Sequence, residues 1–215
     1  NIGGIGNVTF LPPLRDHAAH AFAFDTGPGN MLIDYAASLA TDGRLSYDRD
    51  GELAQRGVVD STLLSELMAQ PFLKLPPPKS TGRELYTAQL AAEIWQRSRS
   101  AGLRPEDIIA TVTDFTAESI AQAYRDFLPI YPDEIIVSGG GGQNPTLMAR
   151  LREKLAPARV RLSDELGLPV EAKEAIAFAI LAYETAHGRP GNLPAATGAT
   201  HPVVLGDISL GRGML

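Results

Sequence analysis

A strand, a glycine-rich turn and a helix follow one another without a break between residues 134 and 155. Residues 134–138 read Glu-Ile-Ile-Val-Ser, four consecutive glycines occupy positions 139–142, and a helical pattern runs from Asn144 to about Leu155. This order is typical of α/β proteins, in which a helix crosses over a sheet after a tight turn. The sequence therefore predicts an α/β fold.

The glycine run also indicates a ligand site. The first N–H groups of a helix lack intrahelical partners and lie at the positive end of its dipole, so they attract anions and nucleotides. A tight turn that needs a positive φ would explain one glycine, whereas four allow a ligand to approach the backbone closely, which favours a site at residues 138–146. The glycines between Asn1 and Asn7 allow the same two explanations, a hairpin turn or a ligand site.

A third glycine-rich turn carries a single carboxylate. Residues 24–30 read Phe-Asp-Thr-Gly-Pro-Gly-Asn, and an apolar strand over residues 21–24 is expected to end at Asp25. Loops at strand ends are where α/β enzymes place groups that touch ligands. The alternative is that Asp25 caps the turn or the next helix, which we expect over residues 31–40 with Asn30 as its N-cap.

Asp-Thr-Gly at 25–27 is also found in aspartic proteases, and residues 206–213 can be aligned with their later Gly-Arg element. Such an enzyme is almost wholly β and needs a second catalytic Asp. This sequence predicts several helices and has no second Asp-Thr-Gly. The protease interpretation is therefore disfavoured.

The rest of the chain is predicted to combine short strands with amphipathic helices. Residues 2–10 form a strand, a turn and a strand, and the turn-rich residues 42–57 form a hairpin or loop. We expect a mixed sheet that starts from residues 1–24, with the helices of residues 84–128 packed on it. The remaining helices are expected over 60–69, 84–100, 105–127 with a break near Asp114, and 171–187, and the remaining strands over 158–162 and, within the Gly/Pro-rich tail 188–215, over 202–205.

Composition excludes several kinds of function. The 215 residues carry a net charge of −6 with scattered basic residues, which argues against a nucleic-acid surface. Cysteine is absent, so neither a disulfide nor a cysteine metal site is present. His17, His20, His187 and His201 lack metal-ligand spacing, and Asp48–Glu52 is interpreted as a β-turn rather than a calcium loop, so no metal ligands are predicted. No apolar run approaches the roughly 18 residues of a membrane helix and no signal peptide is recognisable, which favours a cytoplasmic protein without membrane contact.

Six short motifs occur in order along essentially the whole chain. They are Asn-Ile-Gly-Gly-Ile-Gly-Asn-Val-Thr (1–9), Phe-Asp-Thr-Gly-Pro-Gly-Asn-Met-Leu-Ile-Asp (24–34), Lys-Ser-Thr-Gly-Arg-Glu (79–84), Ser-Gly-Gly-Gly-Gly-Gln-Asn-Pro-Thr-Leu-Met (138–148), Lys-Glu-Ala-Ile-Ala-Phe-Ala (173–179) and Thr-Gly-Ala-Thr (197–200). Each motif alone is weakly specific, but six in one order are highly specific. Together they resemble the anhydro-N-acetylmuramic acid kinase family, of the actin/hexokinase/Hsp70-like phosphotransferase superfamily.

The resemblance implies an RNase H-like, actin-like ATPase fold and a kinase that uses ATP and Mg²⁺. The implied reaction opens the 1,6-anhydro bond of an amino sugar, anhydro-N-acetylmuramic acid, with water and gives N-acetylmuramic acid 6-phosphate in peptidoglycan recycling. Asp25 matches the position of the family's catalytic base, which deprotonates that water, and a homodimer is a family expectation. The implied nucleotide contacts are Gly3, Gly4, Asn7, Gly139, Gly140, Gly141, Gly142 and Asn144, and the implied sugar contacts are Thr26, Gly27 and Glu174. For Glu174, a partnership with the dipole at a helix N-terminus explains the residue equally well.

The sequence departs from the family pattern in two places. The family begins with a Gly-Thr-Ser-x-Asp-Gly phosphate loop that has no counterpart here, and Gly6 stands where the family usually has Ala. Residues 1–215 therefore resemble the C-terminal part of a two-lobed sugar kinase, with the tail 188–215 returning toward the first lobe. Because positioning of the γ-phosphate supplies most of phosphoryl-transfer catalysis, this part alone is expected to bind nucleotide with little turnover. The alternatives are a non-catalytic nucleotide- or sugar-binding fragment and a superfamily kinase for an acyl or simpler sugar substrate.

Overall fold

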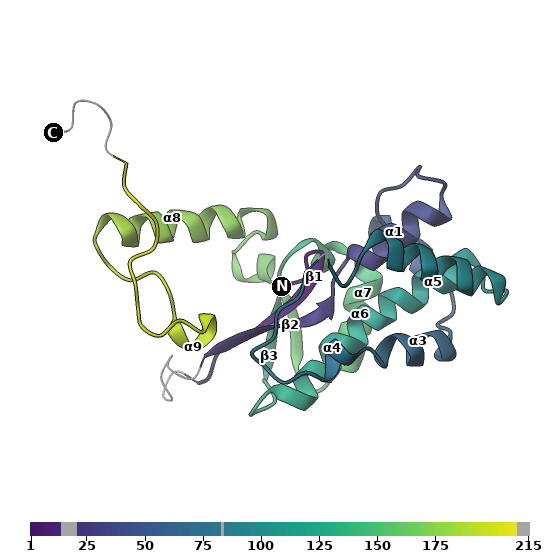
Figure 1. Ribbon diagram of the computed structural model, residues 1–215, viewed down its shortest axis with the longest axis horizontal. Coiled ribbons are helices and arrows are strands. Elements are labelled where there is room, and N and C mark those ends of the chain that lie inside the picture. The colour runs from purple at the N-terminus through teal and green to yellow at the C-terminus, as the bar shows by residue number, and fades with distance from the viewer. Residues whose placement is uncertain (14–20, 83, 210–215) are drawn as a thin grey trace. The chain divides into compact units, whose positions relative to one another are not determined.

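The computed structural model describes residues 1–13, 21–82 and 84–209, and the chain divides into two compact units (Figure 1). The first unit contains residues 1–8 and 24–167, and the second contains residues 9–23 and 168–215. Helices and small sheets occur together, which confirms the predicted α/β class. The helices also exclude the wholly β aspartic protease.

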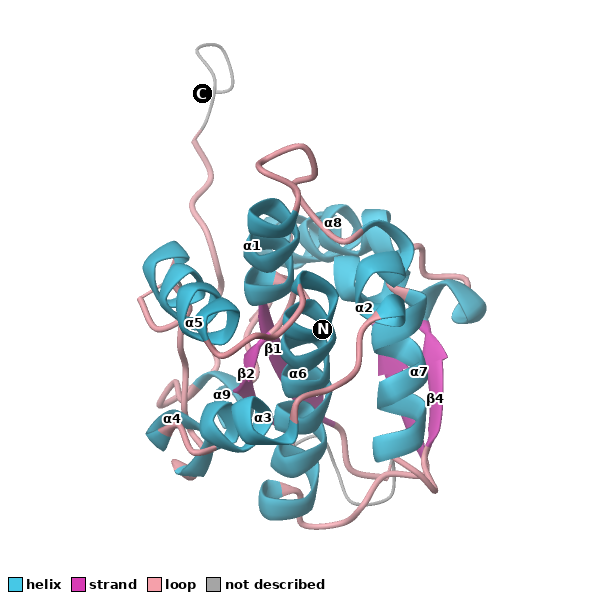
Figure 2. Cartoon of the chain, turned by 90° about the vertical axis from the view of Figure 1, so that its right-hand side faces the viewer, coloured by secondary structure: helices cyan, strands magenta, loops and turns pink. Residues whose placement is uncertain are grey.

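The first unit is organised around one long helix, α6 (Pro105–Phe127) (Figure 2). Proline suits the first turn of this helix because its missing N–H would have no partner there. Every residue from Ile108 to Ala117 is buried, so this part of the helix is covered on all sides. The helices that pack against it are α1 (Met31–Ala40), α2 (Glu52–Arg56), α3 (Ser61–Met68), α5 (Ala88–Ser100) and α7 (Pro145–Lys154).

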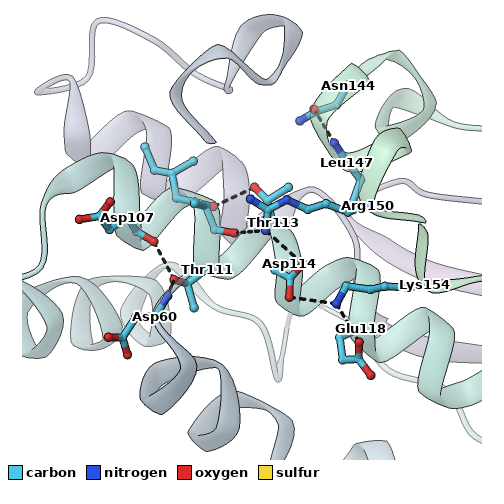
Figure 3. A network of polar contacts seen from close by, with 12 residues as sticks. Asp60, Asp107, Thr111, Thr113, Asp114, Glu118, Asn144, Leu147, Arg150 and Lys154 are labelled. Carbon is cyan, nitrogen blue, oxygen red and sulfur yellow. Dashed lines mark hydrogen bonds and ion pairs between the residues drawn. The ribbon is translucent and has the colours of Figure 1, made fainter. Parts of the chain in front are cut away.

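Helix α6 continues through Asp114, so the break predicted there is wrong. The two carboxylate oxygens of Asp114 each lie 3.1 Å from a cation on α7, one from Arg150 and the other from Lys154 (Figure 3). Lys154 also contacts Glu118, the next acidic residue along α6, at 2.9 Å. Burial would lower the pKa of Lys154, but its hydrogen bonds to Glu118 and Asp114 outweigh burial and raise that pKa. These ion pairs compensate the charge of Asp114 and allow the helix to pass through the core.

Strand β3 (Glu134–Val137), helix α7 and strand β4 (Arg159–Leu162) form the predicted strand–turn–helix–strand unit. The two strands pair in parallel, with Ile135 opposite Val160. Buried and exposed residues alternate along β3, so one face of the strand belongs to the core. Helix α7 lies beside this sheet and packs on β4 (Figure 2). The structure thus confirms the strand, turn and helix over residues 134–155 and the strand over 158–162.

Strands β1 (Ile5–Phe10) and β2 (Phe22–Pro28) pair with each other in a separate two-stranded sheet. In the described part of the chain the two sheets are not joined, so the single mixed sheet expected from residues 1–24 is not present. Strand β2 also continues past Asp25 to Pro28, and the prediction that it ends at Asp25 is wrong. The expected packing of α6 on these strands is confirmed at Phe127, whose ring packs edge-on against Phe24 at 5.8 Å.

Residues 42–57 contain a 3₁₀ helix, η3 (Arg49–Gly51), followed by α2, rather than the predicted hairpin or loop. Asp48 explains the difference, because its carboxylate accepts hydrogen bonds from the N–H groups of Leu53 and Ala54. The carboxylate thereby fixes the first turn of α2, as an N-cap residue does. The Gly51 N–H donates to the Asp48 carbonyl at 3.2 Å, so the β-turn predicted within Asp48–Glu52 is confirmed as part of η3.

Helices α3 and α5 begin at side-chain caps, and the sequence predicted the start of α3 better than that of α5. Helix α3 confirms the helix expected over residues 60–69, and Asp60 caps it by accepting from the Leu63 N–H. Helix α5 begins later than predicted, at Ala88, because Thr87 caps it there. The short elements of this unit not yet named are α4 (Pro71–Lys74), η4 (Gly140–Gln143) and η5 (Ser163–Leu166).

The second unit contains η6 (Val170–Ala172), α8 (Lys173–Ala186) and α9 (Pro194–Thr197). Helix α8 confirms the helix predicted over residues 171–187. The strand predicted over residues 202–205 is wrong, since these residues join no strand in the described part of the chain. None of the helices in the described ranges combines the length and the apolar character that a membrane crossing requires.

Replacing Asp114 with Asn should destabilise the first unit, because Arg150 and Lys154 would lose a counter-charge in the core. Breaking one side of a fully buried pair costs about 3–5 kcal/mol. Both cations keep a second acceptor, the Ala110 carbonyl and Glu118 respectively, so we expect a loss of about 2 kcal/mol in the free energy of unfolding. Urea unfolding of the 215-residue chain measures this loss.

The matched control is Glu52→Gln, which removes the exposed ion pair between Glu52 and Arg56. Exposed pairs contribute little, so this change should alter the free energy of unfolding by less than about 0.5 kcal/mol. Equal effects of Asp114→Asn and Glu52→Gln would contradict the structural role assigned to Asp114.

Candidate functional site

Asp25 is a half-buried residue within β2, and a distant segment of the chain holds its carboxylate. Asp25 Oδ2 accepts hydrogen bonds from Ser80 Oγ and from the Thr81 N–H, each 2.8 Å long. The Asp25 N–H donates to the Lys79 carbonyl oxygen at 3.0 Å. Within the described part of the chain, Asp25 Oδ1 accepts no hydrogen bond. One oxygen therefore fixes the side chain, and the other is able to accept a proton.

The turn at residues 1–7 caps helix α1 with its backbone. The Gly3 carbonyl accepts from the Asn30 N–H at 2.8 Å, and the Gly4 carbonyl accepts from the N–H groups of Gly29 and Met31. Asn30 was predicted to cap α1 with its side chain, but that side chain makes no capping hydrogen bond. The glycine turn thus occupies the N–H groups of Gly29, Asn30 and Met31, and Met31 is the first residue of α1.

The second glycine-rich turn is joined to the same segment through Ile2. The Ile2 N–H donates to the Ser138 carbonyl at 2.7 Å, and the Ile2 carbonyl accepts from the Gly141 N–H at 2.9 Å. The structure therefore brings together residues 1–7, 29–31 and 138–142, which the sequence predicted as separate site elements. Asp25 lies on the strand that leads into residues 29–31.

Packing explains two of the four glycines at 139–142. Gly139 has φ of +88°, and a Cβ there would lie 2.6 Å from the Ile2 carbonyl oxygen. A Cβ at Gly141 would lie 2.3 Å from Ile2 Cγ2. Gly140 is different, because it is exposed and a Cβ there would meet only Asn30 Nδ2, at an ordinary 3.5 Å. Gly140 is the member of the run whose small size the fold itself does not demand.

Asn144 and Gly142 have structural roles in this turn. Asn144 Oδ1 accepts from the Leu147 N–H, so this residue is the N-cap of α7 (Figure 3). The Gly142 N–H donates to the Gly139 carbonyl, and the Asn144 N–H donates to the Gly141 carbonyl. The prediction that the turn presents free N–H groups is wrong for these positions, because the turn itself occupies them.

The residues predicted to touch the sugar lie largely inside the unit. Thr26 is 1% exposed, and among the described residues its hydroxyl has no hydrogen-bond partner. Gly27 has φ of +142°, and a Cβ there would lie 3.0 Å from a methyl group of Leu73. Asn7, predicted to contact the nucleotide, closes the first turn by donating its N–H to the Asn1 carbonyl at 3.0 Å. Ligand contacts by these residues stay predictions.

A cavity of about 480 Å³ opens beside the second glycine-rich turn. Gly140, Gln143 and Asn144 line one part of it, and Asn30, just before α1, and Asp34 within α1 line another. The remaining lining residues are Ile33, Ser46, Tyr47, Asp48, Arg49 and Asp50. This volume is in the range of small-molecule sites, and its mixture of apolar and hydrogen-bonding groups suits a nucleoside.

Two carboxyl groups of the cavity have raised pKa values. Burial, followed by repulsion from Asp48, raises the pKa of Asp34 to about 6. Burial also raises the pKa of Asp48, although its hydrogen bonds from the Ala54 and Leu53 N–H groups oppose the change. A cavity with these carboxyl groups repels phosphates and accepts hydrogen bonds from hydroxyl groups.

Asp34 and Asp48, which line the cavity, were not among the residues predicted from the sequence. A signal existed for Asp34, since it follows Asn30 by four positions on a predicted helix and therefore shares its face. Asp48 offered no such signal, because Asp-Arg-Asp-Gly is typical of an exposed turn. Its place in the cavity depends on Gly51, where a Cβ would lie 2.2 Å from Asn144 Oδ1 and would prevent this approach.

Glu174 belongs to the second unit, where it is exposed in the first turn of α8. This position fits the dipole explanation, and its contact with sugar stays a prediction. His17 and His20 lie outside the described residues, whereas His187 and His201 are exposed. Among the described residues, no group of three or more His, Asp or Glu side chains is placed to hold a metal ion.

The stability of the first unit should depend on pH through Asp34. Its folded-state pKa of about 6 lies above the unfolded value of 3.8. The contribution of the protonated group is therefore fully present below pH about 4 and is lost as the pH rises through about 6. Asn mimics the protonated carboxyl, so Asp34→Asn should raise the free energy of unfolding at about pH 8 by about 1 kcal/mol, after allowance for solvent screening. At about pH 4 the variant and the original chain should be equal.

Urea unfolding at both pH values measures the difference. The control is Asp42→Asn, at an exposed loop position with φ of +51° that asparagine tolerates. This control should show the same pH dependence as the original chain. A difference between Asp34→Asn and the original chain that is unchanged from pH 4 to pH 8 would rule out the assigned effect.

Comparison with known proteins identifies the family. The family model described as anhydro-N-acetylmuramic acid kinase matches residues 1–211. Proteins named anhydro-N-acetylmuramic acid kinase from Acaryochloris marina, Synechococcus elongatus and Gloeobacter violaceus are 46%, 47% and 48% identical to the chain. These matches cover 98%, 97% and 97% of this chain, and 56%, 55% and 54% of those proteins. The chain spans about half the length of the curated relatives it matches, and it belongs to the anhydro-N-acetylmuramic acid kinase family.

Proposed function

We propose that residues 1–215 are the C-terminal part of a kinase that acts on 1,6-anhydro-N-acetylmuramic acid. The full-length protein uses ATP and water to open the anhydro bond and gives N-acetylmuramic acid 6-phosphate in peptidoglycan recycling. Family membership supports the reaction class, and the observation that carries the mechanism is the held carboxylate of Asp25. An actin-like ATPase fold, a cytoplasmic location and a homodimer belong to the same proposal.

Asp25 acts as the general base in this proposal. Its Oδ1 accepts a proton from a water molecule, and the water oxygen forms a bond to the anomeric carbon as the anhydro bond to that carbon breaks. The 6-oxygen released by this cleavage takes the γ-phosphoryl group of ATP, and ADP leaves. A base must be held within hydrogen-bond reach of the proton it removes. The two hydrogen bonds to Oδ2 provide such a fixed position.

The cavity beside Gly140 is the proposed site of the nucleoside end of ATP. Asp34 and Asp48 would accept hydrogen bonds from ribose hydroxyl groups, and the backbone at Gly140 would approach the nucleotide closely. The phosphates lie outside this acidic cavity, toward the exposed Gly4 in the first turn. Mg²⁺ neutralises phosphate charge when bound, and it commonly keeps water ligands and binds substrate phosphates, so a cage of protein ligands is not required.

A non-catalytic nucleotide- or sugar-binding role is the second candidate. It is not favoured, because the family to which the chain belongs is named for a kinase activity. The 215 residues alone are expected to bind nucleotide with little turnover, since γ-phosphate positioning supplies much of phosphoryl transfer. Activity is therefore tested in the full-length protein that contains this sequence.

The substitution Asp25→Asn tests the catalytic role. It keeps the shape of the side chain and its ability to accept from Ser80 and Thr81, but it removes the base. Loss of general-base catalysis typically lowers a rate by about 10²–10⁴, so kcat with the anhydro sugar and ATP should fall by that factor. The Kd for ATP and the Tm should be nearly unchanged, because Asp25 acts on water. A kcat near that of the original protein would end the proposal.

Substitutions of the adjacent residues Gly139 and Gly140 distinguish a role in ligand binding from a role in folding. Gly140→Ala adds a methyl group at the cavity without a close contact inside the protein, so it should weaken ATP binding about tenfold, or about 1.4 kcal/mol, with an unchanged Tm. Gly139→Ala forces an L residue to φ of +88° and against the Ile2 carbonyl, and it should lower the free energy of unfolding by about 1–3 kcal/mol.

Isothermal titration with a non-hydrolysable ATP analogue and thermal unfolding measure the two effects on both variants. Unchanged nucleotide affinity in a stably folded Gly140→Ala protein would show that the nucleotide does not use this cavity.

A further inference from the structure

Lys79 is a buried cation that the proposed reaction does not use. It is 8% exposed, whereas lysine is almost never fully buried unless its charge has partners. Its Nζ donates hydrogen bonds to two consecutive carbonyl oxygens, those of Phe72 at 3.2 Å and Leu73 at 2.9 Å. These carbonyls lie on the short helix α4, so Lys79 ties the extended segment that follows to that helix.

Three aromatic rings surround the Lys79 ammonium group. The ring centres of Phe127, Phe72 and Phe24 lie 4.5, 5.0 and 5.9 Å from Nζ. A cation over the face of an aromatic ring is attracted by the ring electrons, most strongly where water is excluded. Burial lowers the pKa of Lys79, and the nearby charge of Asp126 opposes this. These three rings form an aromatic cage. The cage and the two carbonyls together fix the position of Lys79, where the segment 79–81 begins.

The next two residues are the ones that hold Asp25. Ser80 Oγ and the Thr81 N–H donate to Asp25 Oδ2, and the Lys79 carbonyl accepts from the Asp25 N–H. Phe24, a wall of the cage, directly precedes Asp25 on β2. Lys79 therefore contacts the strand that carries the Asp25 carboxylate and also begins the segment 79–81 that orients this carboxylate.

We propose that Lys79 is a positioning residue for Asp25, a buried ammonium group that sets the angle and the place of the catalytic carboxylate through residues 79–81. The inference rests on the proposed role of Asp25 as the base. A misplacement of about 1 Å in a reacting group can cost about 10²-fold in rate. The chemical step should therefore depend on Lys79, although Lys79 touches neither substrate.

The test compares Lys79→Met with Lys74→Met in the full-length protein. Methionine keeps the unbranched apolar stem but removes the ammonium group, and Lys74 is an exposed lysine at the end of α4. Lys79→Met should lower kcat about 10- to 100-fold while the Kd for a non-hydrolysable ATP analogue stays within about twofold. Lys79→Arg, which keeps a cation and its donors, should recover part of kcat. Lys74→Met should match the original protein in both kcat and Kd.

A double-mutant cycle with Asp25→Asn separates positioning from general support of the fold. If Lys79 acts through Asp25, Lys79→Met should cause no further loss of kcat in the Asp25→Asn protein, because coupled residues are not additive. Independent effects would multiply and overturn the inference. An unchanged kcat in folded Lys79→Met protein would do the same.

Phe127→Leu is a second variant that does not depend on the folding of Lys79→Met. It removes the nearest ring of the cage but keeps the lysine and both carbonyl partners. It should lower kcat several-fold with unchanged nucleotide affinity and show no further loss with Asp25→Asn. Additive loss would overturn the positioning role. The proposed function fails separately, by a normal kcat in Asp25→Asn alone.

Discussion

The burial of helix α6 is the constraint on which the first unit depends. Residues 108–117 of this helix are covered on all sides, so their polar groups need partners inside the protein, and some of these partners belong to the candidate site. Thr116 donates its hydroxyl to the Gly29 carbonyl at 2.8 Å, and Ser119 lies where a Cβ on Gly27 would collide at 3.2 Å. The C-terminal end of the same helix supplies Phe127 to the cage around Lys79. The packing of α6 thus sets the position of the strand that carries Asp25 and of the aromatic rings around Lys79.

Glycine in this chain serves packing more often than ligand approach. Gly29 illustrates the point, because a Cβ there would lie 2.2 Å from the Gly3 carbonyl oxygen and would separate the first turn from α1. The carbonyls of Gly3 and Gly4 then accept hydrogen bonds from the N–H groups of Gly29, Asn30 and Met31, where α1 begins. A glycine-rich turn next to a helix N-terminus is therefore no direct sign of free N–H groups, and Gly140 differs from its neighbours because packing leaves it exposed.

The sequence predicted the fold where structure is local. The unit over residues 134–162 and the helices near 61–68 and 105–127 have their periodicity and their caps within a few residues. The predictions are wrong where a contact between residues far apart in the sequence determines the local structure. The break expected at Asp114 is absent because Arg150 and Lys154 compensate its charge, and β2 passes Asp25 because residues 79–81 satisfy that residue from the side.

The candidate site follows the same division. The sequence motifs that contain Asp25 and Gly140 identified the segments, but the function of each position within them was not visible. Thr26 and Gly141 lie in the same motifs and face the interior. Asp34 and Asp48 reach the cavity from two segments that only tertiary packing brings together. No short sequence motif predicts that these two segments lie close to each other.

The carboxylates of Asp114, Asp34 and Asp25 lie in three different environments, and the differences have chemical consequences. Asp114 lies between two cations, Arg150 and Lys154, which compensate its charge in the core and give it a structural role. Asp34 is half-buried and lies near the carboxyl group of Asp48, and both effects raise its pKa to about 6. Its negative charge is therefore unfavourable until a ligand donates hydrogen bonds to it. Asp25 is given two hydrogen bonds on one oxygen and a support anchored by a buried cation, which restricts its motion. A general base requires a fixed geometry, which Asp25 has. A cavity that binds hydroxyl groups requires a carboxyl group that accepts hydrogen bonds, which Asp34 provides. In the proposed function, the reaction and the binding of the nucleotide therefore use carboxylates in two different environments.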